Sequence, residues 1–192
     1  MKAAMQKIPE WLIYEMVDGR PVYYKGYQAF LSGEKPTEAL KGSSYLQSLI
    51  ATELVILLSR LIDLGKYRIM SNEIGLKYGK KNWRAADIAI YKKEVLKDIP
   101  VNNKSLEVAP EIVIEIDTKA DLESDAGMPG YYHQKTDQLL QFGVKKVIWI
   151  FTDSEKVMVA SGPENWKTSS WKTDVEIMDG VQINISKIVA AQ

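Results

Sequence analysis

Two carboxylates inside an apolar run are the residues of this chain best suited to chemistry. The run covers residues 110–117, and within it Glu115 directly follows Ile112-Val113-Ile114. It is typical of a buried strand that begins after a proline. Because side chains alternate along a strand, Glu115 and Asp117 are predicted to lie on one face of the sheet. Burying a carboxylate is costly unless a cation, a metal ion or hydrogen bonds compensate, so the pair predicts a metal site.

Asp87 is a third carboxylate in an apolar setting, inside a predicted strand over residues 85–91. If this strand pairs with the one that holds Glu115, the two carboxylates approach within metal-ligand distance. One or two carboxylates with open water positions suit Mg²⁺, with Mn²⁺ as an alternative. Such an ion would polarise a scissile phosphate and generate a hydroxide nucleophile. At each position the alternative is a carboxylate that caps a strand end or pairs with a surface lysine.

A site of this kind also benefits from an ammonium group that orients water and stabilises the charge of the phosphorane. Lys135 is the candidate, on an amphipathic helix predicted over residues 131–142 that directly follows the carboxylate strand. Lys119, two residues past Asp117, competes with it. For either lysine the alternative is a solvated surface residue.

Glu73 and His133 are weaker candidates. Glu73 precedes Asp87 in a predicted strand and could be an auxiliary ligand, although a strand glutamate is more often exposed. His133 is the single histidine of the chain, and there is no cysteine. These two counts exclude histidine-rich or thiolate metal sites, Ser-His-Asp catalysis and disulfide bonds.

The elements that must position these residues follow from periodicity and turn signals. Residues 11–17 and 20–24 flank Asp18-Gly19, which predicts an N-terminal β-hairpin with Pro21 on its edge strand. A long helix is predicted from about Ser43 to Leu64 and ends at Gly65. The remaining predicted strands cover residues 67–78, 85–91, 111–117, 145–151, 156–160, 173–178 and 181–185. This order predicts one α/β domain over residues 1–192, with its core at about 43–160 and antiparallel strands at its C-terminal end.

The totals fit a soluble globular domain of 192 residues with 46% hydrophobic and 26% charged residues. The sequence shows no signal peptide and no membrane span, so we expect a cytoplasmic protein. A net charge of zero argues against a strongly basic, non-specific nucleic-acid binder. Cations nevertheless predominate over residues 77–97. Lys80, Lys81 and Arg84 in this stretch would contact DNA phosphates, unless the stretch is a solvated face.

Taken together, these residues resemble the Uma-type (Uma two) restriction endonuclease family of bacteria, within the PD-(D/E)xK nuclease superfamily. The resemblance covers residues 10 to 160. It rests on Asp87, on Pro110 and Glu115 in the next strand, on Lys135 upstream of Gly143-Val144, on the strand of Trp149, and on the opening Tyr14-Glu15-Met16-Val17-Asp18-Gly19. The chain departs from the family pattern at Ala86 for proline, at Thr118 for serine, and at Asp117 in the usual lysine position. A histidine near the start of the long helix is also missing.

The resemblance implies a restriction endonuclease-like core, with a mixed central sheet flanked by helices, and Mg²⁺-dependent hydrolysis of DNA. Asp87 and Glu115 would bind the metal, Asp117 would be a further ligand, and Lys135 would orient the attacking water. A double-strand break needs two such sites, so a homodimer is expected. Two alternatives stay open. One is a catalytically inactive DNA-binding or protein-interaction module on the same fold, and the other is an accessory protein with a structural role.

Overall fold

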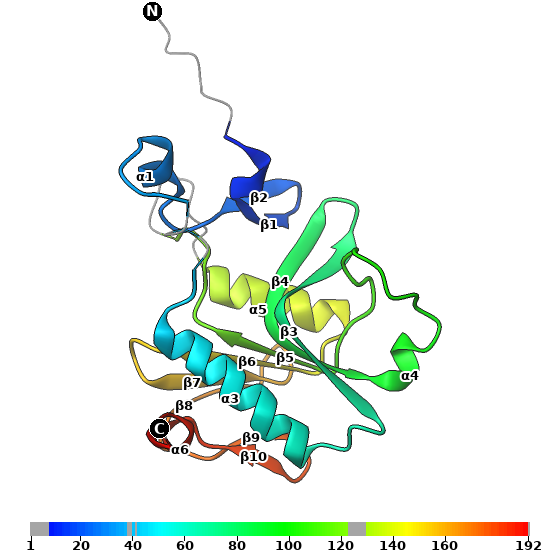
Figure 1. Ribbon diagram of the computed structural model, residues 1–192. Coiled ribbons are helices and arrows are strands. Elements are labelled where there is room, and N and C mark those ends of the chain that lie inside the picture. Colours follow the sequence, from blue (N-terminus) through cyan, green and yellow to red (C-terminus); the bar gives the residue numbers. More distant parts are fainter. Residues whose placement is uncertain (1–7, 38–39, 41, 123–129, 192) are drawn as a thin grey trace, which may run out of the picture.

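A mixed sheet with helices on both faces forms the centre of the computed structural model, which describes residues 8–37, 40, 42–122 and 130–191 (Figure 1). The strands are β1 (Ile13–Val17), β2 (Arg20–Tyr23), β3 (Tyr67–Gly79), β4 (Asn82–Lys92), β5 (Ile112–Ile116), β6 (Lys146–Phe151), β7 (Lys156–Ala160), β8 (Trp166–Ser170), β9 (Val175–Met178) and β10 (Val181–Ile183). The helices are the 3₁₀ turn η1 (Glu10–Leu12), α1 (Tyr27–Leu31), α3 (Tyr45–Leu61), α4 (Lys93–Leu96), α5 (Tyr131–Phe142) and α6 (Ile185–Ala190). The predicted α/β fold class is therefore confirmed.

The main sheet has eight strands, in the order β2-β1-β4-β5-β6-β7-β8, with β3 paired to β4 beside this path. Strands β5 and β6 are parallel, and the other described pairs of this sheet are antiparallel. The predicted N-terminal hairpin is β1 and β2, with Pro21 on the edge strand as expected. The predicted C-terminal antiparallel strands are β9 and β10, which form a small sheet of their own.

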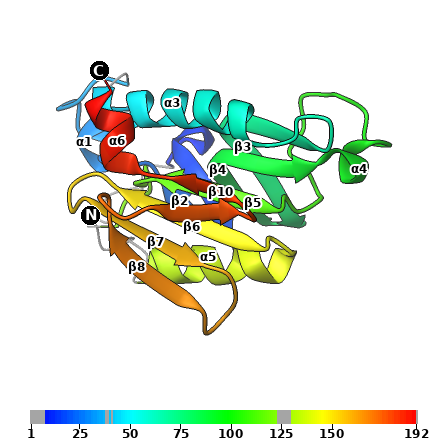
Figure 2. The same cartoon turned by 90° about the horizontal axis from the view of Figure 1, so that it is seen from below.

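Helices α3 and α5 lie on opposite faces of the main sheet, as the view from below shows (Figure 2). Isoleucines of β4 and β5, such as Ile88 and Ile114, pack in one buried cluster with Ile50 and Leu54 of α3. Ala89 and Val113, their neighbours in sequence, pack in a second cluster with residues of α5. Since side chains alternate along a strand, the positions of Asp87 and Glu115 belong to the face that α5 covers.

The two long helices have the ends that their sequences encode. Ser44 caps α3, because its side chain accepts a hydrogen bond from the backbone N–H of Gln47 while the Gln47 side chain accepts one from Ser44 N–H. The helix ends at Leu61, earlier than predicted, because Ile62 is already extended. Helix α5 ends as predicted at Gly143, whose φ of 119° favours glycine.

Five elements were not predicted because their sequences carry little periodic signal: η1, α4, α1, β8 and α6. Helix α1 has five residues, too few for a helical repeat, and lies in the region predicted to be a loop. Strand β8 pairs with β7 at the sheet edge and consists largely of polar residues, Lys167-Thr168-Ser169-Ser170. Helix α6 begins where the last predicted strand was expected to end. Among the described helices, none is both long and apolar enough to cross a membrane.

Candidate active site

Pairing of β4 with β5 brings Asp87 and Glu115 side by side, as the sequence predicted. The strands are antiparallel with Ile88 opposite Ile114, and extending this register by one residue places Asp87 opposite Glu115. Opposite residues of an antiparallel pair share one face of the sheet, with Cβ atoms about 5 Å apart. The backbone N–H of Ile116 donates to Asp87 Oδ2 at 2.7 Å, which fixes the Asp87 carboxylate across the two strands.

Both carboxylates resist ionisation. Burial raises the pKa of Glu115 to about 8, with Lys135 opposing this shift and Asp87 adding to it. Burial likewise raises the pKa of Asp87, against the hydrogen bond from Ile116 and the charge of Lys135. Two desolvated carboxylates on one face would be stabilised in their charged forms by a bound cation.

Lys135 of α5 completes this group from the facing helix. Its side chain is fully buried, and its Nζ lies 3.0 Å from Glu115 Oε1 and 2.8 Å from Glu15 Oε1. These are ion-pair distances without the alignment of a regular hydrogen bond. The rings of Tyr14, Tyr131 and Trp149 surround the ammonium, with their centroids 5.8, 5.8 and 5.4 Å from Nζ.

The electrostatics keep the Lys135 side chain protonated. Burial disfavours the ammonium, but Glu115 and Glu15 outweigh it and hold the pKa of Lys135 well above its ordinary value. The alternative of a solvated surface lysine therefore does not hold for Lys135.

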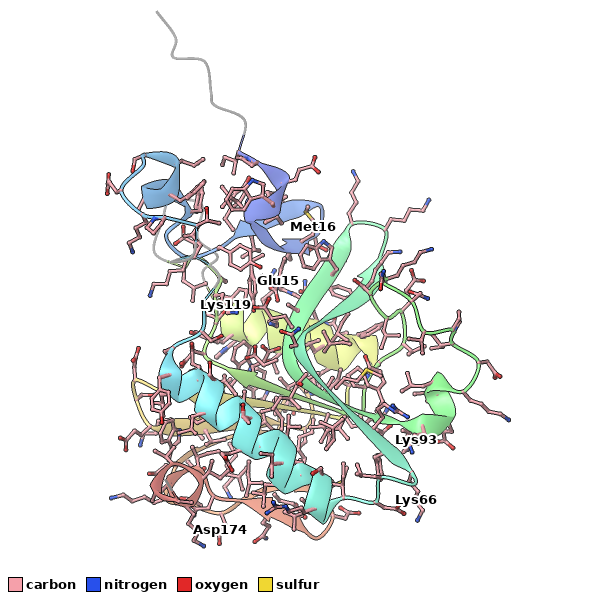
Figure 3. The ribbon with its side chains drawn as sticks, in the orientation of Figure 1. Glu15, Met16, Lys66, Lys93, Lys119 and Asp174 are labelled. Atoms are coloured by element: carbon pink, nitrogen blue, oxygen red, sulfur yellow. The ribbon has the colours of Figure 1, made fainter. Side chains whose placement is uncertain are left out.

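Glu15, on β1 of the N-terminal hairpin (Figure 3), is a member of the site that sequence reasoning did not assign. Its buried carboxylate accepts from Arg84 Nη1 at 2.6 Å, from the Tyr131 hydroxyl at 2.7 Å and from the backbone N–H of Ala85 at 3.1 Å. Burial would raise its pKa, but Lys135 and Arg84 hold the pKa of Glu15 below its ordinary value. The signal that could have found it is the one that revealed Glu115, a carboxylate inside an apolar strand.

The position of Arg84 differs from the one predicted for the cation-rich stretch over residues 77–97. It was expected to contact DNA phosphates with Lys80 and Lys81, but its side chain is fully buried. Its guanidinium donates to Glu15 and, through Nε and Nη2, to the side-chain oxygen of Gln138 at 3.1 and 2.6 Å. A count of charges along the chain does not distinguish a buried ion pair from a solvated face, which is why the expectation was wrong. Lys80 and Lys81 are exposed at the turn between β3 and β4.

Asp87 also lines a cleft of about 410 Å³ between α3, β3 and the end of β5. Glu73 and Lys119 lie in the wall of the same cleft and form an ion pair at 2.5 Å (Lys119 is labelled in Figure 3). Asn72 and Glu73 have φ angles of 77° and 54° at an irregularity in the pairing of β3 with β4. The cleft gives Asp87 a path to solvent, whereas Glu115 and Lys135 are almost or fully inaccessible.

Asp117 does not join the other predicted site residues. Strand β5 ends at Ile116, and Asp117 has a φ of 55°, so the alternation that placed it beside Glu115 does not extend to it. Its carboxylate accepts from Thr152 N–H at 2.8 Å, Thr152 Oγ1 at 2.5 Å and Gln47 Nε2 at 3.0 Å. It lines a separate cavity of about 400 Å³.

The residues present fit a magnesium ion. Asp87 and Glu115 supply hard oxygen ligands from adjacent strands, and the Lys135 ammonium lies 3.0 Å from Glu115 Oε1. In the part of the chain that the structure describes, no group of three or more His, Cys, Asp or Glu side chains converges. Mg²⁺ typically uses one or two carboxylates together with waters and substrate phosphates, so a two-carboxylate site suffices.

His133, a weaker candidate in the sequence, packs against another aromatic residue. Its ring stacks on Trp166, with centroids 5.0 Å apart.

Comparison with known proteins identifies the fold. No family model and no curated protein matches the chain. Among solved structures, the chain is similar to a protein from Anabaena variabilis ATCC 29413, described as "a putative nuclease belonging to DUF820", with a TM-score of 0.68 and 15% identity. The similarity covers 96% of this chain and 94% of that chain. At this identity it shows a shared fold over nearly the whole length, which confirms the predicted fold class.

Proposed function

We propose that this protein is a metal-dependent DNA endonuclease that hydrolyses phosphodiester bonds. One observation carries the proposal: Asp87 and Glu115 lie opposite each other on paired strands, and the Lys135 ammonium lies 3.0 Å from Glu115. Two carboxylates on one face of the sheet, with an ammonium from the helix that covers this face, are groups that can assist metal-dependent phosphodiester hydrolysis. The fold shared with the DUF820 protein, which is described as "a putative nuclease", supports the same function.

In this proposal Asp87 and Glu115 hold Mg²⁺, with Mn²⁺ as an alternative. The bound ion would polarise the scissile phosphate and lower the pKa of an attacking water. Lys135 remains protonated and favours the ionised form of Glu115, which is the form that binds a cation. Its positive charge would also stabilise the negative charge that develops on the phosphate. Lys80 and Lys81, exposed at the turn between β3 and β4, would contact phosphates without reading sequence.

A catalytically inactive DNA-binding or protein-interaction module is the second candidate. The observation in its favour is the near-complete burial of Glu115 and Lys135, which engage each other rather than solvent. Asp87 argues against it, because the carboxylate opposite Glu115 lines a cleft of about 410 Å³ that is open to solvent.

Cleavage of supercoiled plasmid, with Mg²⁺ and with a chelator in its place, separates the two candidates. We expect wild-type protein to cleave only with Mg²⁺ and Glu115→Gln to lose about 100-fold or more in rate, because the substitution removes a charged ligand. Glu111→Gln is the matched control: Glu111 precedes the same strand and pairs with Lys92 at 3.4 Å, outside the site. Wild-type cleavage that persists in Glu115→Gln contradicts the proposed mechanism, and the absence of Mg²⁺-dependent cleavage by wild type favours the inactive module.

A further inference from the structure

The carboxylate of Glu15 links the N-terminal hairpin to the site. It is fully buried, and its partners come from β4 and α5: the Arg84 guanidinium, the Ala85 N–H, the Tyr131 hydroxyl and the Lys135 ammonium. Glu15 lies about 70 residues upstream of Arg84 and farther from Lys135, so the contact forms only in the folded protein. Strand β1 therefore brings a second carboxylate, beside that of Glu115, within ion-pair distance of Lys135.

The position of the Lys135 ammonium is determined by two carboxylates at once. Its Nζ lies 2.8 Å from Glu15 Oε1 and 3.0 Å from Glu115 Oε1. The other neighbours of Nζ are aromatic rings, which attract a cation but do not fix its position as a carboxylate does. If Glu15 lost its charge, Glu115 would be the remaining carboxylate within ion-pair distance of Lys135 among the described residues.

We propose that Glu15 is a positioning residue of this site. It holds the Lys135 ammonium between β1 and β5, so that Lys135 is shared by Glu15 and Glu115 and does not pair with Glu115 only. The inference rests on the proposed function. In this arrangement the negative charge of Glu15 offsets the positive charge of Lys135, so Lys135 repels a divalent cation that approaches Glu115 and Asp87 less strongly. Glu15 itself needs no contact with the metal or the substrate.

Replacing the charged Glu15 by Gln should weaken Mg²⁺ binding. The substitution keeps the size of the side chain and removes one negative charge near the site. The loss of this negative charge weakens the binding of a divalent cation more than that of a proton, because the electrostatic interaction energy scales with the charge of the bound ion. Substitution of a residue that orients the groups around a metal typically lowers metal affinity or activity by about 10–100-fold.

The test compares Glu15→Gln with Glu111→Gln, which removes the same charge from a glutamate that pairs with Lys92 outside the site. Mg²⁺ affinity is measured by isothermal titration calorimetry at one fixed pH, and kcat and KM are measured on plasmid DNA. For Glu15→Gln we expect the Kd for Mg²⁺ to rise and kcat to fall, each by roughly 10–100-fold, with little change in KM for DNA. For Glu111→Gln we expect values within about twofold of wild type, because the charge that it removes lies outside the site.

A spectroscopic readout reports on Lys135 directly. In protein labelled with ¹⁵N-lysine, the resonance that disappears in Lys135→Met is assigned to the Lys135 ammonium. We expect this resonance to shift in Glu15→Gln and to stay near its wild-type position in Glu111→Gln. A Glu15→Gln protein with wild-type Mg²⁺ affinity, kcat and ammonium resonance would overturn the proposal.

Two further outcomes are distinguished from a failure of this proposal: a variant that does not fold, and a wild-type protein that does not cleave DNA. If Glu15→Gln does not fold, because Lys135 and Arg84 are left facing one carboxylate, the double variant Glu15→Gln/Arg84→Gln removes both partners of the buried pair and is tested in its place. If wild-type protein binds Mg²⁺ but cleaves no DNA, the proposed function fails. The Mg²⁺ affinity and the ammonium resonance still decide the role of Glu15, since neither requires turnover.

Discussion

At the scale of the residue, Glu115 combines deep burial with a proposed role, metal binding, that requires a charged carboxylate. Its pKa of about 8 results from burial, which Lys135 only partly offsets. A carboxyl group with a raised pKa holds its proton at neutral pH in the absence of a metal ion. Only the ionised form can bind a cation, so metal binding must displace that proton.

The affinity for Mg²⁺ should therefore depend on pH. Below the Glu115 pKa of about 8, the carboxyl group is protonated and must ionise before it binds the metal. We expect the Mg²⁺ affinity to rise by up to about tenfold per pH unit between pH 6 and 8 and to level off above this range. Calorimetric titrations in buffers of different ionisation enthalpy measure the proton released. An affinity and proton release that do not change between pH 6 and 8 would contradict this assignment, and Glu111→Gln should keep the wild-type pH dependence.

Individual residues show what sequence reasoning could find and what it could not. Asp87 and Glu115 were predicted to approach each other because a carboxylate in an apolar strand is visible in the sequence, and the register of β4 with β5 confirms that approach. Glu15 follows the same pattern on β1, but its partners on β4 and α5 could not be identified without the tertiary structure. Arg84 was misplaced for the same reason, since its guanidinium is buried against Glu15.

At the scale of the element, strand ends and chain reversals were harder to predict than the strands themselves. The periodic segments β4, β5, α5, β6 and β7 were found with bounds close to those observed. Asp117 shows the difficulty, because one residue of positive φ after β5 ends the alternation on which its expected position depended. Its carboxylate instead connects Thr152, directly after β6, with Gln47 on α3.

Asp117→Ala tests whether this carboxylate connects elements or binds metal. We expect a loss of about 1–3 kcal/mol in the free energy of unfolding, because the Thr152 N–H and the Gln47 amide lose their acceptor. We expect the Mg²⁺ affinity to remain within about twofold of wild type, since Asp87 and Glu115 are unchanged. Urea denaturation and calorimetry measure the two quantities. A loss of Mg²⁺ affinity as large as that of Glu115→Gln would instead make Asp117 a metal ligand, as the sequence first indicated.

At the scale of the whole molecule, the sheet connects groups that are far apart in the chain. The N-terminal hairpin reaches β4 through Met16 and Trp83, and in this way places Glu15 over the face that α5 covers. The order of strands along the sheet was not predictable from local signals, because neighbours such as β1 and β4 are separated in the chain by β2, β3 and the long helix α3. The fold shared with the DUF820 protein extends over 96% of the chain.

The number of chains that act together also belongs to this scale, and a homodimer stays a prediction. One site of the proposed kind cuts one DNA strand, so a double-strand break requires two copies related by a two-fold axis. We expect nicked plasmid to accumulate at low protein concentration and linear plasmid to dominate at high concentration. Analytical ultracentrifugation over the same range should show a transition from monomer to dimer. Excess Glu115→Gln protein mixed with wild type provides the control, because mixed dimers hold one intact site and should yield nicked plasmid. Linear plasmid formed in the same proportion at every concentration, and in the mixture, would show that a single copy cuts both strands.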